Sequence, residues 1–195
     1  MFRRFFVVVV AGLAMLVAPQ IVIKPVPGSA WAKTASLDVP FVATPQQVVD
    51  KMLEMANVTG DDYVIDLGSG DGRIPITAAK RYGADAMGVD LDPNRIRQAK
   101  ENAKKAGVDG KVEFKHQDLF DTDISKATVL TMYLLPKVNM RLRPRILSEL
   151  KPGTRVVSHS FDMGDWKPER TEKVDGRTIY FWTVPAPGKR AHAPQ

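Results

Sequence analysis

A short stretch in the first half of the chain combines a carboxylate with three closely spaced glycines. Asp66 lies in a short apolar run, and the glycines after it are Gly68, Gly70 and Gly72, in a G-x-G-x-G spacing. A dinucleotide-binding turn has G-x-G-x-x-G instead, because a pyrophosphate must approach both the turn and the following helix. A diphosphate would also be repelled by Asp66 and Asp71, whereas an α-amino group would not. The stretch therefore predicts a site for a ligand with a cationic group.

Two further acids follow later apolar runs. Asp90 ends the next run, 22 residues after Gly68, and a carboxylate there can accept hydrogen bonds from both hydroxyls of a ribose. Asp118 follows the third run, where a carboxylate can accept a hydrogen bond from the exocyclic amine of adenine. The neighbouring leucines, Leu91 and Leu119, are assigned to the same site, and Leu119 can pack on the adenine ring.

Alternating strand and helix patterns predict the elements that position these acids. The β-branched run at residues 63–67 is typical of a buried parallel strand, and the helix after the glycine turn should end at Gly83. Asp92 as N-cap and Gly107 as stop delimit a second helix. Further strands are expected at residues 85–90, 112–115, 127–133, 155–158 and, antiparallel, 179–184. The predicted fold is α/β and Rossmann-like.

Two features of the predicted helices have simple structural interpretations. Thr44 is expected to cap the first helix of the domain, with Pro45 at its first position and Gln47 completing a capping box. Near the helix predicted at residues 142–150, three basic side chains share a face and are interpreted as a solvated stripe: Lys137, Arg141 and Arg145.

The run from Asp66 to Gly72, which includes Ser69 and Asp71, resembles motif I of class I S-adenosylmethionine (SAM) methyltransferases. The domain as a whole is similar to bacterial relatives of the mitochondrial protein-lysine N-methyltransferases that modify the adenine nucleotide translocase and the ATP synthase c-ring protein. Three stretches carry this closer resemblance: residues 41–44, residues 66–74, and residues 152–162 with 166–168. The family usually has a tyrosine and a proline where this chain has Phe41 and Ala43, and often a glutamate in place of Asp90.

The resemblance implies SAM as cofactor and a seven-stranded, mostly parallel sheet with a last antiparallel strand. For residues 41–44, including Thr44, two roles stay open: they simply lead into the packed first helix, or they also close over the methionine end of the cofactor. The resemblance implies that the methyl acceptor is a lysine. The lysine ammonium group must lose a proton before it attacks the methyl group, and an aromatic or apolar site promotes that loss. Residues after the fourth and fifth strands, together with Phe41 of the segment before the first helix, are expected to line such a site. The expected catalytic residues are Tyr133, His159 and Asp162, and the expected substrate-binding residues are Phe41, Leu135, Pro136 and Trp166.

Three other functions stay open. A small molecule or lipid could be the acceptor, or the chain could be an exported protein that binds SAM or a nucleoside without turnover. A nucleic-acid acceptor is disfavoured, because the Asn/Asp-Pro-Pro-Tyr motif of amino-base methyltransferases is absent after the fourth strand. The scattered histidines and the lack of cysteine predict no metal site.

The N-terminus predicts export or anchoring. Arg3 and Arg4 precede an apolar segment at residues 5–23, and Ala30-Trp31-Ala32 is an A-x-A cleavage site, so residues 1–32 are interpreted as a signal peptide or an uncleaved membrane anchor. Both interpretations place the domain, residues 33–184, in the periplasm or at the inner membrane, followed by a disordered tail at 185–195. Without residues 1–32 the net charge of +6 falls by three basic residues to +3.

Overall fold

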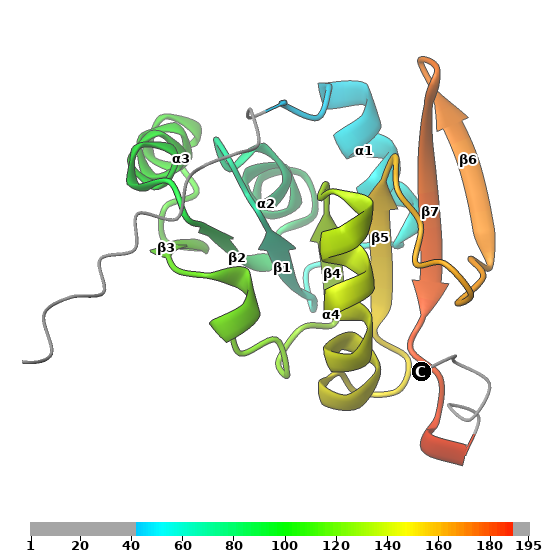
Figure 1. The fold of residues 1–195 in the computed structure, drawn as a ribbon. Coiled ribbons are helices and arrows are strands. Elements are labelled where there is room, and N and C mark those ends of the chain that lie inside the picture. Colours follow the sequence, from blue (N-terminus) through cyan, green and yellow to red (C-terminus); the bar gives the residue numbers. More distant parts are fainter. Residues whose placement is uncertain (1–41, 189–195) are drawn as a thin grey trace, which may run out of the picture. The chain divides into compact units, whose positions relative to one another are not determined.

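The computed structural model describes residues 42–188, which form a seven-stranded sheet with helices on both faces (Figure 1). The strand order is β3-β2-β1-β4-β5-β7-β6. The first five strands run parallel, and β7 is antiparallel to both of its neighbours. The strands are β1 (Tyr63–Leu67), β2 (Asp85–Asp90), β3 (Val112–His116), β4 (Val129–Met132), β5 (Arg155–His159), β6 (Arg170–Val174) and β7 (Arg177–Thr183). The predicted fold class is confirmed.

The helices begin and end close to their sequence signals. Asp92 Oδ1 accepts the Asn94 N–H at 2.8 Å and caps α3, and left-handed Gly83 and Gly107 follow the ends of the second and third helices. These are the residues that the sequence assigns to the same tasks. The helices are α1 (Gln46–Met55), α2 (Arg73–Thr77) with its π-helical continuation η1 (Ala78–Tyr82), α3 (Pro93–Ala106), the 3₁₀ turn η2 (Leu119–Asp121) and α4 (Pro136–Glu149).

Side-chain alternation along the strands separates two hydrophobic cores. Val64 and Val129 pack in the core beneath α1, α2 and α3, whereas their neighbours Ile65 and Leu130 pack in the core beneath α4. Because successive side chains of a strand point to opposite faces, Asp66 shares the face of Val64. The predicted ligand-binding acid therefore lies on the α1–α3 side of the sheet.

Three elements differ from the sequence predictions. Thr44 does not cap α1, because its hydroxyl is hydrogen-bonded to the His159 ring and Pro45 occupies the N-cap position. Helix α4 begins at Pro136, six residues before the predicted start, and continues through Pro144. Strand β6 has no counterpart among the predicted strands, because its residues are mostly polar and it pairs only with β7 at the edge of the sheet.

The basic residues of α4 fix a loop rather than forming a solvated stripe. Arg145 donates to the carbonyl oxygens of Phe120 and Thr122, at 2.5 and 2.8 Å, and forms an ion pair with Glu149. The Arg141 guanidinium lies 3.9 Å from the centroid of the Phe120 ring. Helix α4 therefore holds the turn after β3 in place, which corrects the interpretation of these two residues.

A buried ion pair closes the amino edge of the sheet. Asp62 pairs with Arg155 at the start of β5 and accepts hydrogen bonds from Thr128 Oγ1, at 2.7 Å, and from the Thr59 N–H, at 2.8 Å. Burial alone raises the pKa of a carboxyl group, but these donors outweigh it and hold the pKa of Asp62 below its usual value. The edge opposite the predicted site is thereby locked by complementary charges.

Within residues 42–188, no helix is both long and apolar enough to cross a membrane. The predictions for residues 1–32, Phe41 and most of the C-terminal tail fall on residues outside this range or reach beyond it.

One glycine of β2 should be irreplaceable for packing. A Cβ on Gly88 would lie 2.7 Å from Ser69 Cβ and 2.7 Å from a ring carbon of Phe114. We expect Gly88→Ala to lower the free energy of unfolding by about 1–3 kcal/mol, the usual cost of overpacking. Denaturant melts of the full chain measure this. Gly110→Ala is the control, because nothing lies within 4 Å of its Cβ position, and it should change stability by less than about 0.5 kcal/mol.

Candidate active site

The motif I turn is pinned to the neighbouring strand by its own backbone. The N–H groups of Gly68 and Ser69 both donate to the Val89 carbonyl oxygen, at 3.0 and 2.9 Å. Gly68, Gly70 and Gly72 have φ angles of +78°, +53° and +81°, which disfavour residues with a Cβ. The spacing of the glycines is thus a requirement of the backbone path between β1 and α2.

Asp66 is a buried carboxyl group without a nearby cation. The residue is 2% exposed, and Thr131 Oγ1 donates a hydrogen bond to its Oδ1 at 2.7 Å. Burial raises the pKa of Asp66 to about 7, with a smaller contribution from the negative charges of Asp90 and Asp71, while the Thr131 hydrogen bond opposes the shift. Among residues 42–188, no ion-pair partner of Asp66 is present. An ammonium group would supply the missing positive charge.

Asp90 connects the end of β2 to the motif I turn. Its Oδ2 accepts the Gly70 N–H and its Oδ1 accepts the Asp92 N–H, both at 2.9 Å. Each carboxylate oxygen has a second lone pair, so both oxygens retain acceptor capacity for a pair of hydroxyl groups. The two amides fix the carboxylate at the carboxyl end of β2, beside the motif I turn.

The predicted adenine contacts lie on the turn after β3. Asp118 Oδ1 accepts the Phe120 N–H at 2.8 Å, so this oxygen is used to cap the 3₁₀ turn. Leu119 is half-buried in that turn, and Leu91 is 40% exposed after β2. Since Arg145 holds the turn from α4, the two residues of this turn have a fixed position at the carboxyl edge.

Two rings stack where β4 and β5 end. The centroids of the Tyr133 and His159 rings are 3.9 Å apart with an interplanar angle of 34°, and Phe161 lies 6.3 Å beyond Tyr133. Left-handed Ser160, with φ +66°, turns the chain between His159 and Phe161. The sequence assigns Tyr133 and His159 to one site, and the structure brings them into contact.

The His159 ring is buried and uncharged at neutral pH. Its Nδ1 lies 3.0 Å from Thr44 Oγ1, and its Nε2 is buried without a hydrogen-bond partner in the described part of the chain. Burial, and secondarily the positive charge of Arg177, lowers the pKa of His159 to about 4. A neutral imidazole has one donor and one acceptor nitrogen, and the Thr44 hydroxyl can pair with Nδ1 in either state, so Nε2 takes the complementary role.

The structure does not bring all the predicted residues to this pair of rings. Asp162 is exposed, and its Oδ1 accepts the Gly164 N–H at 3.0 Å. Trp166 packs against Trp182 of the core beneath α4, with the two ring centroids 5.7 Å apart. Leu135 and Pro136 lie where α4 begins; Leu135 is 44% exposed and Pro136 is also exposed.

Four residues that position the site have no role assigned from the sequence. Thr131 contacts Asp66 from the neighbouring strand β4, and Arg73 bridges the motif I turn and the segment before α1. From α4, buried Asn139 donates to the Phe161 carbonyl oxygen at 3.2 Å, and Arg143 to that of Met163 at 2.9 Å. Only Arg73 has a local signal, since it directly follows the glycine turn.

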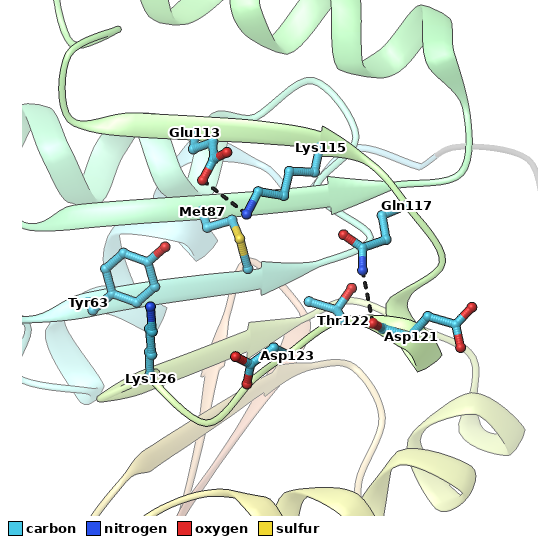
Figure 2. A pocket seen from close by; sticks show the side chains of 9 residues that line it. All are labelled: Tyr63, Met87, Glu113, Lys115, Gln117, Asp121, Thr122, Asp123 and Lys126. Atoms are coloured by element: carbon cyan, nitrogen blue, oxygen red, sulfur yellow. Dashed lines mark hydrogen bonds and ion pairs between the residues drawn. The ribbon is translucent and has the colours of Figure 1, made fainter.

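A polar pocket of about 280 Å³ lies on the other face of the sheet (Figure 2). Glu113 and Lys115 of β3 line it with Tyr63 and Met87, and the two charged side chains form an ion pair of 3.1 Å. Phe114, between them, points into the α1–α3 core. Because Asp66 belongs to the α1–α3 face, this pocket and Asp66 lie on opposite faces of the sheet.

The chain matches the family model of the ANTKMT methyltransferase domain over residues 66–170. A protein-lysine N-methyltransferase from Saccharolobus islandicus (strain REY15A) is 48% identical over 151 residues, which are 75% of this chain and 94% of that relative. The chain belongs to this family of methyltransferases. An adenine nucleotide translocase lysine N-methyltransferase from Mus musculus is 32% identical over 143 residues, 71% of this chain. The chain spans 62% of the length of this mouse relative.

A solved structure is similar over the same region. The crystal structure of an RNA methyltransferase from Salinibacter ruber, in complex with S-adenosyl-L-homocysteine, has 56% sequence identity and a TM-score of 0.73. The similarity covers 74% of this chain and 94% of that one. Together with the family match, it identifies the protein as a SAM-dependent methyltransferase.

The residues at the carboxyl edge fit SAM. The buried carboxyl group of Asp66 is suited to the amino group, Asp90 to the ribose hydroxyls, and the glycine turn leaves room for close approach of the backbone. Bound SAM supplies a methyl group that is already electrophilic, so the protein needs to form no covalent intermediate. Its own residues must bind and orient the two substrates and keep the acceptor nucleophilic.

The pKa of Asp66 gives a pH-dependent prediction for the protein without SAM. Between the unfolded pKa near 3.8 and the folded pKa of about 7, the folded state binds more protons, so stability falls as pH rises through this window. Asp66→Asn removes the buried charge and should raise the melting temperature most at pH 8, with a gain that shrinks as the pH falls toward 4. Asp62→Asn should instead lower it at pH 8, because Asp62 is stabilised in its charged form.

The same variant tests the assignment of the amino group. Wild-type affinity for SAM should weaken as pH falls below about 7, because Asp66 must then lose a proton to receive the ammonium. In Asp66→Asn the free energy of SAM binding should be less favourable by about 1.5–3 kcal/mol, the range for a hydrogen bond to a charged group. The affinity of this variant should no longer depend on the ionisation of residue 66. Calorimetry between pH 5.5 and 8.5 measures both effects, and unchanged affinity would contradict the assignment.

A second prediction separates Asp90 from its neighbour. Asp90→Ala removes the predicted ribose acceptor and the brace on Gly70, and should weaken SAM binding by about 1.5–3 kcal/mol. Asp92→Ala removes the cap of α3 and should lower stability by about 0.5–2 kcal/mol with a small effect on affinity. The reverse pattern in calorimetry and thermal melts would show that the end of β2 is assigned incorrectly.

Proposed function

We propose that the protein transfers the SAM methyl group to the ε-amino group of a lysine in a protein substrate. The observation that carries this proposal is the stacked pair of Tyr133 and His159 at the carboxyl edge, with a buried, neutral imidazole. The names of the family relatives support it, because those from Saccharolobus islandicus and from mouse are both lysine N-methyltransferases.

The chemistry of an amine acceptor suits this pair. A lysine must attack as the neutral amine, and burial beside uncharged rings lowers the pKa of an ammonium group. With the imidazole proton on Nδ1, donated to Thr44, Nε2 keeps a lone pair and can accept an N–H of the amine. The nitrogen lone pair of the amine is then free to attack the methyl group. The Tyr133 hydroxyl can orient the same amine, since its ring lies directly on the imidazole.

Neutral His159 is better suited to orienting the amine than to storing its proton. A group with a pKa of about 4 is a weak base at pH 7, and efficient general bases titrate near the working pH. Asp162 is exposed, and one of its carboxylate oxygens is used to hold its own turn. The proton therefore leaves to solvent before the neutral amine enters the site.

We further infer that the substrate is a membrane or envelope protein. The support is the predicted N-terminal segment, residues 1–32, which as a signal peptide or an anchor would bring the domain to the membrane. RNA is the second candidate, because the 56% identical protein from Salinibacter ruber is described as an RNA methyltransferase.

Methyl transfer into cell extract tests the acceptor class. Full-length protein is incubated with methyl-labelled SAM and an extract fractionated into membrane proteins, soluble proteins, lipids and RNA. We expect label in membrane proteins, and methyl-lysine after hydrolysis. Label in RNA or lipid would overturn the lysine proposal, and label in soluble proteins alone would overturn the inferred location of the substrate.

Tyr133→Phe tests the acceptor site itself. The variant keeps the ring that stacks on His159 and loses only the hydroxyl, so melting temperature and SAM affinity should stay near wild type. Turnover should fall by about one to three orders of magnitude, as for a lost transition-state hydrogen bond. Tyr180→Phe, whose ring packs near Trp182, is the matched control and should keep full turnover. Equal turnover of the two variants would exclude a role for the Tyr133 hydroxyl.

A further inference from the structure

Arg73 lies between the motif I turn and the segment that precedes α1. Its Nε and Nη2 donate to the two carboxylate oxygens of Asp71, at 2.9 and 2.5 Å. Its Nη1 donates to the Thr44 backbone carbonyl oxygen at 2.7 Å. One planar guanidinium thus uses three donors in two directions, a geometry that lysine does not reproduce.

Each partner of Arg73 is fixed on its far side. Asn102 of α3 donates to the Asp71 carbonyl oxygen at 3.0 Å, which ties the turn to a helix. Thr44 is 4% exposed, and its hydroxyl contacts His159 Nδ1 at 3.0 Å. The contacts therefore run without a gap from Asp71 through Arg73 and Thr44 to His159.

The end of this series is the ring that stacks on Tyr133. Thr44 is separated from His159 by 115 residues, and it lies just before α1, so its position depends on what holds the segment. The Arg73 contact acts on the Thr44 backbone, whereas the His159 contact uses its side chain. Loss of the first contact would move the hydroxyl and free the imidazole to rotate.

We propose that Arg73 is a positioning residue for the methyl-acceptor site: it holds Thr44 so that the Thr44 hydroxyl fixes the orientation of the His159 ring. Arg73 touches neither the acceptor nor the reacting methyl group and acts through Thr44. The same guanidinium braces the turn that receives the cofactor, so one residue aligns the two halves of the reaction. The inference rests on the proposed role of His159 for its effect on turnover, but its effect on the His159 ring can be measured without any acceptor.

The first test is spectroscopic and uses the full chain with ¹⁵N-labelled histidine. The sequence contains three histidines, so the ring resonances are few and His159→Gln assigns one set. In the wild type we expect one sharp set of ring resonances from a His159 ring held in one orientation. Thr44→Val and Arg73→Gln should both shift and broaden these resonances, whereas Thr44→Ser should keep the wild-type spectrum. An unchanged His159 spectrum in Arg73→Gln would overturn the proposal.

The second test is a double-mutant cycle in turnover. Thr44→Val should lower kcat by about 10- to 100-fold, the scale of a small misplacement of a reacting group, with SAM affinity unchanged. Arg73→Gln should lower kcat by a similar factor, and the double variant should be no worse than the poorer single variant. Multiplied losses in the double variant would show that Arg73 does not act through Thr44.

Arg81→Gln is the matched control. Arg81 also ties the second helix to α1, through an ion pair of 2.6 Å with Asp50, but it is exposed and takes no part in the contacts that reach His159. It should leave both kcat and the His159 spectrum unchanged. If Arg73→Gln only lowers SAM affinity and melting temperature, with a wild-type spectrum, Arg73 braces the turn alone and the proposal is wrong. A changed spectrum without label transfer to lysine would instead reject the proposed function and leave the positioning role intact.

Discussion

The rest of the site depends on a buried carboxyl group at the end of the central strand. Asp66 has a hydroxyl beside it, from Thr131, but no cation among the described residues, and its pKa is raised to about 7. The charged form of a carboxyl group is unfavourable in this environment, and a bound ammonium group would stabilise it. The folded protein therefore holds a buried carboxyl group whose charged form an ammonium group would stabilise.

The same domain contains a buried aspartate with the opposite solution. Asp62, at the other edge of the sheet, has Arg155, Thr128 and the Thr59 amide as partners, and its pKa is lowered. The two acids differ in what surrounds their charge. Asp62, whose charge is paired, joins β1 to β4 and β5, whereas Asp66, whose charge is unpaired among the described residues, lies where the strands end and the glycine turn begins. Parallel strands place their carboxyl ends at a common edge, and ligands bind there in open α/β sheets.

Helix α4 and the segment before α1 give this edge its shape. From one side, Arg145 fixes the turn after β3, and Asn139 and Arg143 fix the loop after β5. From the other, Arg73 fixes the Thr44 carbonyl. The loop after β3 contains only the 3₁₀ turn η2 and the loop after β5 contains no helix, so side chains from neighbouring elements hold both loops in place. A rigid site loses less entropy when it binds and orients its substrates.

The sequence by itself determined the α/β class of this fold and its parallel centre, because these depend on local signals: β-branched runs, glycines with positive φ, and caps such as Asp92 and Gly107. The cofactor class came instead from the resemblance of residues 66–72 to motif I of SAM methyltransferases. The sequence did not reveal β6, although Asp175-Gly176 in the turn before β7, both with positive φ, is a hairpin signal. Only the tertiary structure decided that Thr44 bonds to His159 rather than capping α1, that Trp166 packs on Trp182, and that Arg73 joins the two halves of the site. The physical reason is that these side chains meet partners far away in the sequence, and the choice between a local and a distant hydrogen bond depends on which groups the folded sheet brings within reach.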